Sequence, residues 1–360
     1  MNSRTAKKLD QLWEKEQLDA FVLFSREYDN RPNVQYLSGF SGSAAAVVLM
    51  PENNYLVVDS RYFVQAEEES DFIIGRIPGR DPWPVLAGIF EQNRVRTLGF
   101  EMEKLTVDWF RRLDSLGVSL KGYENFFKSL RSVKDENELT LIRKSCEIAS
   151  RAFNDVYPRI EPGMTEAGLA AELAYSMRKF GAENLAKGHF VVASGVRGER
   201  PHGVFSNKVI EKGDFITMDF GAVYKGYFSD ITRTVAVGPI DSRLEEIYSV
   251  VLEANRIGIE GAGSRISGRD LDEKVRSYVF SQGFGEYFTH STGHGIGLEL
   301  HEFPNVNVAN DEYLPVNSVI TIEPGIYLPG IGGVRIEDDV VIGECGCEVL
   351  SFAEKELVIL

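Results

Sequence analysis

The chain has 360 residues, and its formal net charge is −15 because 54 acidic residues outnumber 39 basic ones. A strongly acidic surface repels phosphate backbones, so no nucleic-acid partner is expected. No apolar stretch approaches the roughly 20 residues that span a bilayer, so no membrane partner is expected either. The apolar content of 43% is typical of globular proteins, and the length exceeds what one hydrophobic core usually supports, which indicates two domains.

The cysteines and the N-terminus indicate a cytoplasmic protein. The three cysteines, Cys146, Cys345 and Cys347, form neither an even disulfide framework nor a paired zinc motif. They are typical of a reduced chain with incidental thiols. The first ten residues alternate polar and charged side chains and lack the apolar segment of a secretion signal.

Residues 1–125 alternate between helical and strand-like patterns, which predicts an α/β domain. A helical stripe of Leu9, Leu12 and Trp13 comes first. The strand-like segments that follow are 20–24, 45–49, 55–58 and 97–100, and the helical ones are 61–69 and 107–116. The pattern breaks between 122 and 135, so we place the domain boundary after residue 125.

The second predicted domain, 126–360, contains an internal repeat of two helices. A helical stripe that begins at Leu139 recurs from Leu244, and a second stripe, with N-cap candidate Thr165, recurs from Ser267. Glycines 181 and 283 stand where the second helix of each pair should end. Strand-like segments follow each helix pair, so the pattern predicts an α+β domain with a pseudo-twofold axis. A site is expected in the cleft between its halves.

The first pair of candidate metal ligands lies in a predicted hairpin. Its strands are 216–222 and 228–234, joined by a tight turn at 224–226. Folded about 224 and 225, this hairpin makes Asp219 and Asp230 cross-strand neighbours, with Cβ atoms roughly 5 Å apart. Two ionised carboxylates at that distance repel each other, so one should be neutral unless a cation lies between them.

A second predicted hairpin repeats this arrangement. Glu323 and Glu337 stand symmetrically about residue 330, inside a turn at 328–333, and should also face each other. Arg335 precedes Glu337 by two residues, so it points to the same face of the strand. Four carboxylates would balance two divalent cations, and oxygen ligands suit a hard ion such as manganese. The geometry favours a dinuclear site over its alternatives, a structural ion site or a surface charge patch.

Histidines are scarce, and most of them lie in glycine-rich or turn segments. The five are His189, His202, His290, His294 and His301. His290 and His294 have the spacing of a helical zinc pair, but glycines at 293, 295 and 297 oppose a helix, so a loop close to a ligand fits better. One histidine could ligate a metal while others bind substrate or move protons; alternatively, all are surface loop residues. For His189 the sequence suggests only a structural role.

At these motifs the sequence resembles the proline-specific peptidases of the pita-bread metallopeptidase family, aminopeptidase P and prolidase. The matching segments are 192–195, 201–203, 218–221, 229–234, 290–302, 321–325 and 333–338. They follow the family order through residues 130–360, and the N-terminal domain is also similar. The resemblance implies an α+β pita-bread catalytic domain with a pseudo-twofold repeat at 126–360, preceded by a smaller α/β domain at 1–125.

The resemblance also implies the residues of the site. The metal ligands are then Asp219, Asp230, His294, Glu323 and Glu337, and the substrate site is lined by His202, His290, His301 and Arg335. In the family pattern Asp230 and Glu337 bridge two ions, Asp219 completes one ion's site, and His294 with Glu323 completes the other's. Mn²⁺ is the expected ion, with Co²⁺ and Zn²⁺ as alternatives. Glu323 is also expected to handle the proton of the attacking water.

The activity implied by the resemblance is metal-dependent hydrolysis of the Xaa-Pro bond at the N-terminus of peptides, by a homodimer. Segments 39–42 and 59–62 look more like the aminopeptidases than the dipeptidases. The alternatives are a prolidase restricted to dipeptides, a non-catalytic pita-bread binding module, and a dinuclear phosphoesterase. Segments 188–190 and 197–200 depart from the family pattern, and both are expected near the substrate.

Overall fold

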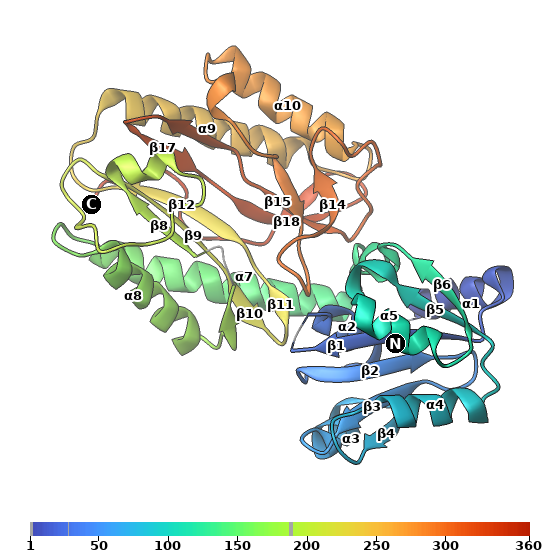
Figure 1. The fold of residues 1–360 in the computed structure, drawn as a ribbon. Coiled ribbons are helices and arrows are strands. Elements are labelled where there is room, and N and C mark those ends of the chain that lie inside the picture. The colour runs from blue at the N-terminus through green and yellow to red at the C-terminus, as the bar shows by residue number, and fades with distance from the viewer. Residues whose placement is uncertain (1–2, 28, 187–189) are drawn as a thin grey trace. The chain divides into compact units, whose positions relative to one another are not determined.

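The computed structural model describes residues 3–27, 29–186 and 190–360, so His189 lies outside the described residues. The chain divides into two compact units, Met1–Leu130 and Arg131–Leu360 (Figure 1). The boundary predicted after residue 125 falls just before helix α6, Phe126–Arg131, whose Phe127 and Leu130 pack into the core of the first unit. Within the described ranges, no helix has both the length and the apolar composition that crossing a membrane requires.

The first unit is built on one mixed sheet of six strands in the order β4-β3-β2-β1-β5-β6. In chain order the strands are β1 Ala20–Arg26, β2 Ala44–Leu49, β3 Tyr55–Asp59, β4 Ile73–Ile77, β5 Thr97–Glu101 and β6 Ser119–Tyr123. The three strands β1, β2 and β3 form antiparallel pairs. The parallel pairs β3–β4 and β5–β6 are each connected through a helix, as parallel neighbours require.

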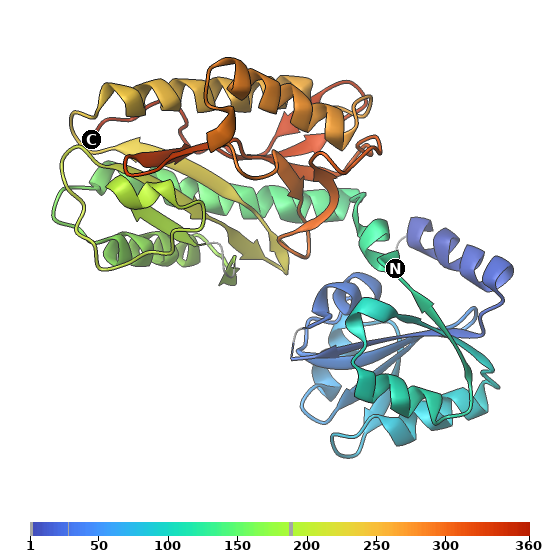
Figure 2. The same ribbon diagram turned by 45° about the horizontal axis from the view of Figure 1, so that its top comes forward.

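Helices cover both faces of this sheet, which confirms the predicted α/β architecture (Figure 2). Besides α6 they are α1 Ser3–Glu16, α2 Arg31–Ser38, α3 Phe63–Glu69, α4 Trp83–Gln92, α5 Val107–Asp114 and the short 3₁₀ helix η1 Met102–Lys104. One core lies between the sheet and helices α1, α2, α3 and α6. The second core lies on the other face, under α4 and α5.

Four elements of this unit have no clear sequence signature: α2, α4, β4 and β6. Each of the two helices carries a proline in its first turn, which in sequence is typical of a turn. The two strands lie at the edges of the sheet. Edge strands alternate weakly between apolar and polar side chains, and Ile73 in β4 is 49% exposed.

The second unit contains the two predicted helix pairs. They are α7 Glu136–Val156 with α8 Glu166–Lys179, and α9 Ser242–Gly261 with α10 Gly268–Ser281; the 3₁₀ turns are η2 Tyr157–Arg159, η3 Gly195–Glu199 and η4 Gly285–Tyr287. Both predicted N-caps are confirmed, because the Thr165 hydroxyl accepts from Gly168 N and the Ser267 hydroxyl from Asp270 N, each at 3.0 Å. Glycines 181 and 283 lie one residue beyond the C-caps, with φ of 108° and 84°.

The strands of the second unit lie between these helix pairs, with α7 and α8 on one side and α9 and α10 on the other (Figures 1 and 2). The strands are β7 Asn184–Leu185, β8 Val191–Ser194, β9 Phe215–Phe220, β10 Ala222–Tyr224, β11 Tyr227–Phe228, β12 Ile231–Ala236, β13 Gly293–Gly295, β14 Glu302–Val306, β15 Val319–Ile322, β16 Gly325–Leu328, β17 Gly332–Arg335, β18 Asp338–Ile342 and β19 Cys347–Val349. The two main sheets have the orders β12-β9-β8 and β14-β13-β15-β18-β19. An isolated bridge pairs Thr232 of β12 with Glu337, the residue just before β18, and brings the two acidic hairpins together.

Candidate metal centre

The first hairpin forms, but its register differs from the prediction. The turn is Lys225-Gly226, and both residues have positive φ, 49° and 83°. These backbone angles are typical of a two-residue hairpin turn. The centre of the turn therefore lies at 225–226, and not at 224–225 as predicted, which shifts the pairing of the two strands. Asp219 therefore pairs with Thr232. Asp219 and Asp230 are diagonal neighbours on one face of the hairpin; the prediction that they lie directly opposite each other was wrong.

The second hairpin follows the predicted register. In the ladder next to the turn at 329–331, Gly325 pairs with Arg335. In the next ladder, further from the turn, Ile322 pairs with Asp338. Glu323 and Glu337 occupy the same register between these two ladders, so they face each other. The charge of Glu323 accordingly acts on Glu337.

A histidine completes the cluster from a third strand. His294 lies in the middle of β13, and ligand atoms of Asp230, His294 and Glu337 all lie within 4.8 Å of one another. The Nε2 atom of His294 is 3.4 Å from Glu323 Oε1 and 3.7 Å from Asp230 Oδ2. The segment is a short strand, not the predicted loop. Its glycines allow the close packing, because a Cβ on Gly293 would lie 1.9 Å from a backbone oxygen of β15.

A backbone carbonyl fixes the orientation of the His294 ring. Its Nδ1 lies 3.0 Å from the carbonyl oxygen of Gly295, and a carbonyl can only accept, so Nδ1 carries the proton. In the neutral ring Nε2 then presents a lone pair to the carboxylates of Asp230 and Glu323. A lone pair facing carboxylate oxygens is unfavourable unless a proton or a cation lies between them.

The carboxylates of the cluster are held in a setting that disfavours their charge. Burial, together with Glu337 and Asp219, raises the pKa of Asp230 well above its ordinary value. Burial and the charges of Glu323 and Asp219 do the same to the pKa of Glu337. Burial raises the pKa of Glu323 to about 8, although the positive charge of Arg335 opposes the shift. Bound dications would reverse this penalty, because they favour the ionised form of each acid.

The residues present fit a pair of divalent ions. The Oδ1 atom of Asp230 is buried and accepts no hydrogen bond from any described residue, so a donor or cation is missing from its surroundings. The donor set is four carboxylates and one imidazole, which suits Mn²⁺, Co²⁺ or Zn²⁺. The five residues that would hold the ions are Asp219, Asp230, His294, Glu323 and Glu337.

Arg335 connects this cluster to a chain of hydrogen bonds. Its Nη2 donates to Asp219 Oδ2 at 2.6 Å, and its Nη1 donates to the Tyr327 hydroxyl at 2.7 Å. Hydrogen bonds link Arg335 to Glu337 through Thr232, whose hydroxyl accepts from Arg335 and donates to Glu337 Oε2 at 2.6 Å. The direct carboxylate partner of Arg335 is thus Asp219.

His290 is the last residue in this chain of hydrogen bonds. Its Nδ1 donates to the carbonyl of Ser291 at 2.8 Å, so its Nε2 accepts from Tyr327 at 2.9 Å. Burial, helped by the charge of Arg335, lowers the pKa of His290 to about 4, and the ring is neutral at pH 7. Both ring nitrogens are therefore engaged within the protein.

The remaining predicted histidines are exposed. The ring of His301 lies 4.2 Å from that of His294, centroid to centroid, so His301 borders the metal cluster. His202 is on a loop with Glu199, Arg200 and Pro201 that borders a shallow hollow. The charge of His202 acts on His290, which places His202 near the same site. All predicted site residues within the described ranges thus gather around one cluster.

Sequence reasoning missed two members of the site, Tyr327 and Thr232. Tyr327 is in β16, opposite Gly333, and its ring turns inward to meet Arg335 and His290. Its only sequence signal is an aromatic residue two positions after Gly325, which is also common in a buried strand. Thr232 could have been suspected, because it alternates with Asp230 and so shares its face of the strand.

Comparisons with known proteins agree with this geometry. Residues 140–344 match metallopeptidase family M24, and residues 6–133 match the creatinase/prolidase N-terminal domain. The crystal structure of an X-Pro aminopeptidase from Thermotoga maritima has a TM-score of 0.91 and 41% identity, covering 96% of this chain and 98% of that one. An Xaa-Pro dipeptidase from Bacillus anthracis has a TM-score of 0.94 and 38% identity, covering 99% of each chain. An Xaa-Pro dipeptidase of Pyrococcus horikoshii is 38% identical over 362 residues, 99% of both proteins.

The fold and the acidic cluster define a two-domain metallopeptidase with the pita-bread fold, which confirms the predicted fold class. The chain belongs to metallopeptidase family M24, and its similar relatives are Xaa-Pro dipeptidases and aminopeptidases. It is therefore an enzyme, and the alternative hypothesis of a non-catalytic binding module is wrong. The names of the relatives are divided between dipeptidase and aminopeptidase, so they leave that distinction open.

Proposed function

We propose that this enzyme removes the N-terminal residue from peptides with proline at the second position, by hydrolysing the Xaa-Pro bond with two divalent ions, Mn²⁺ first among them. The observation that carries this proposal is the convergence of Asp230, His294 and Glu337 within 4.8 Å, beside the facing pair Glu323 and Glu337. The kinship with Xaa-Pro peptidases supports the substrate class. The homodimer and the cytoplasmic location stay predictions from the sequence.

The chain's own residues have separate roles in this proposal. When bound, the dications supply an acidified water and polarise the scissile carbonyl. Glu323 receives the proton of the attacking water, since its side chain, 16% exposed, is more open than those of Asp219 and Asp230, at 8% and 5%. The Thr321 hydroxyl donates to Glu323 Oε1 at 3.2 Å and orients the carboxylate. Arg335 holds Asp219 in place.

His301 is better placed than His290 to stabilise the oxyanion of the tetrahedral intermediate. That role needs an N–H on the substrate side of the metal cluster. His290 donates its only proton to Ser291, and its other nitrogen accepts from Tyr327. His301 is exposed, and its ring lies 4.2 Å from that of His294, so it borders the metal cluster. We assign His290 instead to positioning Tyr327 and, through it, Arg335.

The test is peptide hydrolysis by metal-stripped enzyme that is resupplied with single dications. The substrates are an Xaa-Pro dipeptide and the matching Xaa-Pro-Xaa tripeptide, with an Xaa-Ala tripeptide as the control for proline selectivity. We expect Mn²⁺ to restore cleavage of both proline peptides and the tripeptide to be cleaved at least as fast. Cleavage of the dipeptide alone would identify a prolidase. Equal cleavage of the Xaa-Ala peptide, or hydrolysis of a phosphate ester alone, would refute the proposal.

A further inference from the structure

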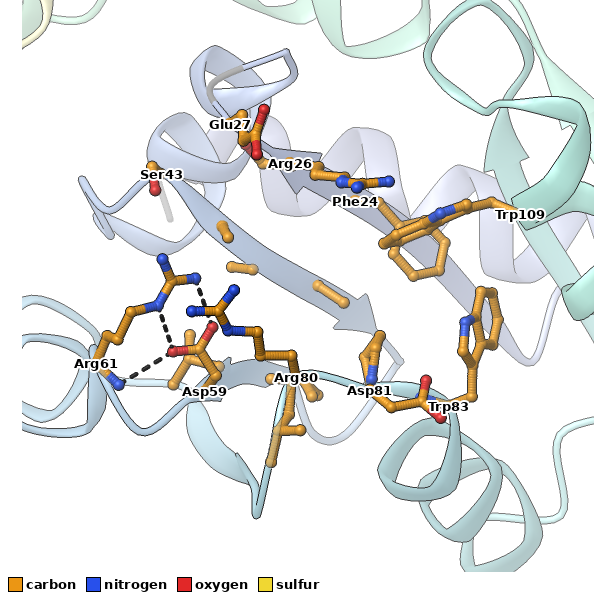
Figure 3. Close-up of a pocket in the computed structure, with 18 of the residues that line it drawn as sticks. Phe24, Arg26, Glu27, Ser43, Asp59, Arg61, Arg80, Asp81, Trp83 and Trp109 are labelled. Carbon is orange, nitrogen blue, oxygen red and sulfur yellow. Dashed lines mark hydrogen bonds and ion pairs between the residues drawn. The ribbon is translucent and has the colours of Figure 1, made fainter.

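The N-terminal unit has a hollow of its own, on the face of the sheet that carries α4 and α5 (Figure 3). Its volume is about 510 Å³, and all its lining residues lie between positions 24 and 112, so it is separate from the metal cluster. A hollow of this volume accommodates a small ligand. Nothing in the proposed peptidase chemistry uses it.

Small side chains on a central strand form the floor of the hollow. Ala44 and Ala46 alternate along β2 and so share one face. Ala46 pairs with Phe24 on one side and with Val57 on the other. A larger residue at either alanine would fill the space, so the depression arises from the sequence of β2 itself.

An aromatic wall closes one end of the hollow. The ring centroids of Phe24 and Trp109 are 4.4 Å apart, and Trp83 lies 5.6 Å from Phe24 and 5.5 Å from Trp109. The three rings come from β1, α4 and α5. Both tryptophans are half-buried and line the hollow, so they present aromatic surface to it.

A positively charged corner lies at the other end. Arg61 forms a bidentate pair with Asp59 at 2.9 and 2.7 Å, and Arg80 lies close enough to help lower the pKa of Asp59 after the larger effects of Arg61. Figure 3 shows the two guanidinium groups beside that single carboxylate. Two cations against one anion leave a net positive charge, which favours a ligand carboxylate. Because Asp59 already occupies the fork of Arg61, a bidentate pair with that carboxylate would form at Arg80.

The rest of the lining carries charges of both signs, with Glu27, Asp81 and Asp108 as the acids and Arg26 and Arg112 as the bases. Asp81 lies between Arg80 and Trp83 in the sequence and borders the hollow, as does Glu27 (Figure 3). These acids oppose a polyanion such as a nucleotide, as does the net charge of −15. They suit a ligand that also carries an ammonium group. A zwitterion with an apolar side chain would match the positively charged corner, the acids of the lining and the aromatic wall.

The size of the site agrees with this chemistry. Phe24 is level with Val57 in the register, two strands away, and Asp59 lies two residues further along β3. Strand spacing and rise then place the Cα atoms of Phe24 and Asp59 roughly 12 Å apart. The side chains of Phe24 and Asp59 occupy part of this distance, and the space left between them is the size of an amino acid or a short peptide.

We propose that this hollow is an accessory binding site for an apolar amino acid or short peptide, with its carboxylate at Arg61 and Arg80 and its side chain against Trp83 and Trp109. Free amino acids and peptides share this recognition chemistry, so a titration must distinguish them. The site would let the enzyme bind products or peptides in its N-terminal unit.

Tryptophan fluorescence tests the proposal on the full-length protein. All three tryptophans, Trp13, Trp83 and Trp109, lie in the first unit, and the last two line the hollow. The ligands are leucine, glycyl-leucine and leucinamide, none of which is aromatic. We expect a saturable change with leucine or glycyl-leucine below about 10 mM, and the tighter of the two identifies the source. Leucinamide, which lacks the carboxylate, should bind at least about tenfold more weakly.

Two variants and one control locate the response. Arg80→Ala should weaken binding about tenfold or more, and Ala44→Leu should abolish it by filling the floor. Arg76→Ala is the matched control, because Arg76 alternates with Ile77 and pairs with Glu67 outside the hollow. Thermal unfolding of each variant establishes that it is folded.

Three results would overturn the proposal. The first is unchanged binding in folded Arg80→Ala and Ala44→Leu variants. The second is equal affinity for leucine and leucinamide. The third is a fluorescence change that follows protein concentration and not ligand, which would instead indicate that a second copy of the chain covers the tryptophans.

Discussion

Arg335 and Asp219 form a buried ion pair, with Nη2 of the arginine 2.6 Å from Oδ2 of the aspartate. The same guanidinium donates to Tyr327, so one side chain orients a predicted metal ligand and a hydrogen-bond chain that ends at His290. Only the planar fork of arginine can serve two partners in this way.

Replacing Arg335 with lysine should therefore lower kcat about 10- to 100-fold, because the ammonium keeps the charge but loses one partner. The measurement is steady-state hydrolysis of an Xaa-Pro tripeptide with saturating Mn²⁺. Arg143→Lys is the control, since Arg143 forms an exposed bidentate pair with Glu348. An Arg335→Lys enzyme as active as the control would show that the fork has no catalytic importance.

Asp230→Asn should remove both bound metal and turnover. Asparagine lacks the negative charge that, in the proposed function, Asp230 contributes to holding the dications. Metal content per chain by elemental analysis is the direct readout, and exposed Asp71→Asn is the control. Two tightly bound ions and normal turnover in Asp230→Asn would mean that this residue is not a bridging ligand.

His301→Asn should lower kcat about 100-fold and leave metal content unchanged. A donor to the oxyanion acts mainly in the transition state, so KM should change much less than kcat. The experiment compares kcat and KM for one tripeptide and determines bound metal on the same preparations. If kcat stays normal, the oxyanion donor must be sought elsewhere.

Glu166 anchors the loop that carries His202. Its buried carboxylate accepts from Ser194 N at 2.8 Å, from Arg197 Nε at 3.0 Å and from Ser206 N at 3.0 Å. Glu166→Gln turns one acceptor into a donor that faces other donors. It should cost about 1–3 kcal/mol of unfolding free energy and raise KM. Chemical denaturation gives the free energy, with exposed Glu161→Gln as the control; a loss no larger than the control's would contradict this assignment.

The stability of the enzyme should depend on pH through Glu138. Burial raises its pKa to about 7 in the folded chain, from an ordinary value of 4.5, while its carboxylate accepts from Asp135 N and the Tyr227 hydroxyl. The fold thus favours the protonated acid. Its contribution is fully present below pH 4.5 and is lost as pH rises through about 7.

Glu138→Gln removes this titration and keeps an acceptor in the capping box. The difference in melting temperature, variant minus parent, should be more positive near pH 8 than near pH 5. Glu136→Gln, an exposed change in the same helical turn, should show no such trend. A difference that is constant across this range would exclude the shifted pKa.

Local patterns in the sequence determined much of this structure. The caps at Thr165 and Ser267 and the glycines at 181 and 283 depend on hydrogen bonds within a few residues, so they can be read without a fold. The facing of Glu323 and Glu337 follows from symmetry about one turn. The nature of the ligand set, four carboxylates and a histidine, was likewise accessible from residue type and from family resemblance.

Tertiary structure alone decided how these pieces meet. One exception is local: the diagonal offset of Asp219 and Asp230 follows from the turn at Lys225 and Gly226, whose positive φ the hydrophobic pattern does not encode. The approach of His294 to Asp230 and the reach of Arg335 to Asp219 join residues more than 60 positions apart. Such contacts arise only when the two sheets dock, because side-chain packing between distant segments is set by the whole fold and not by local sequence.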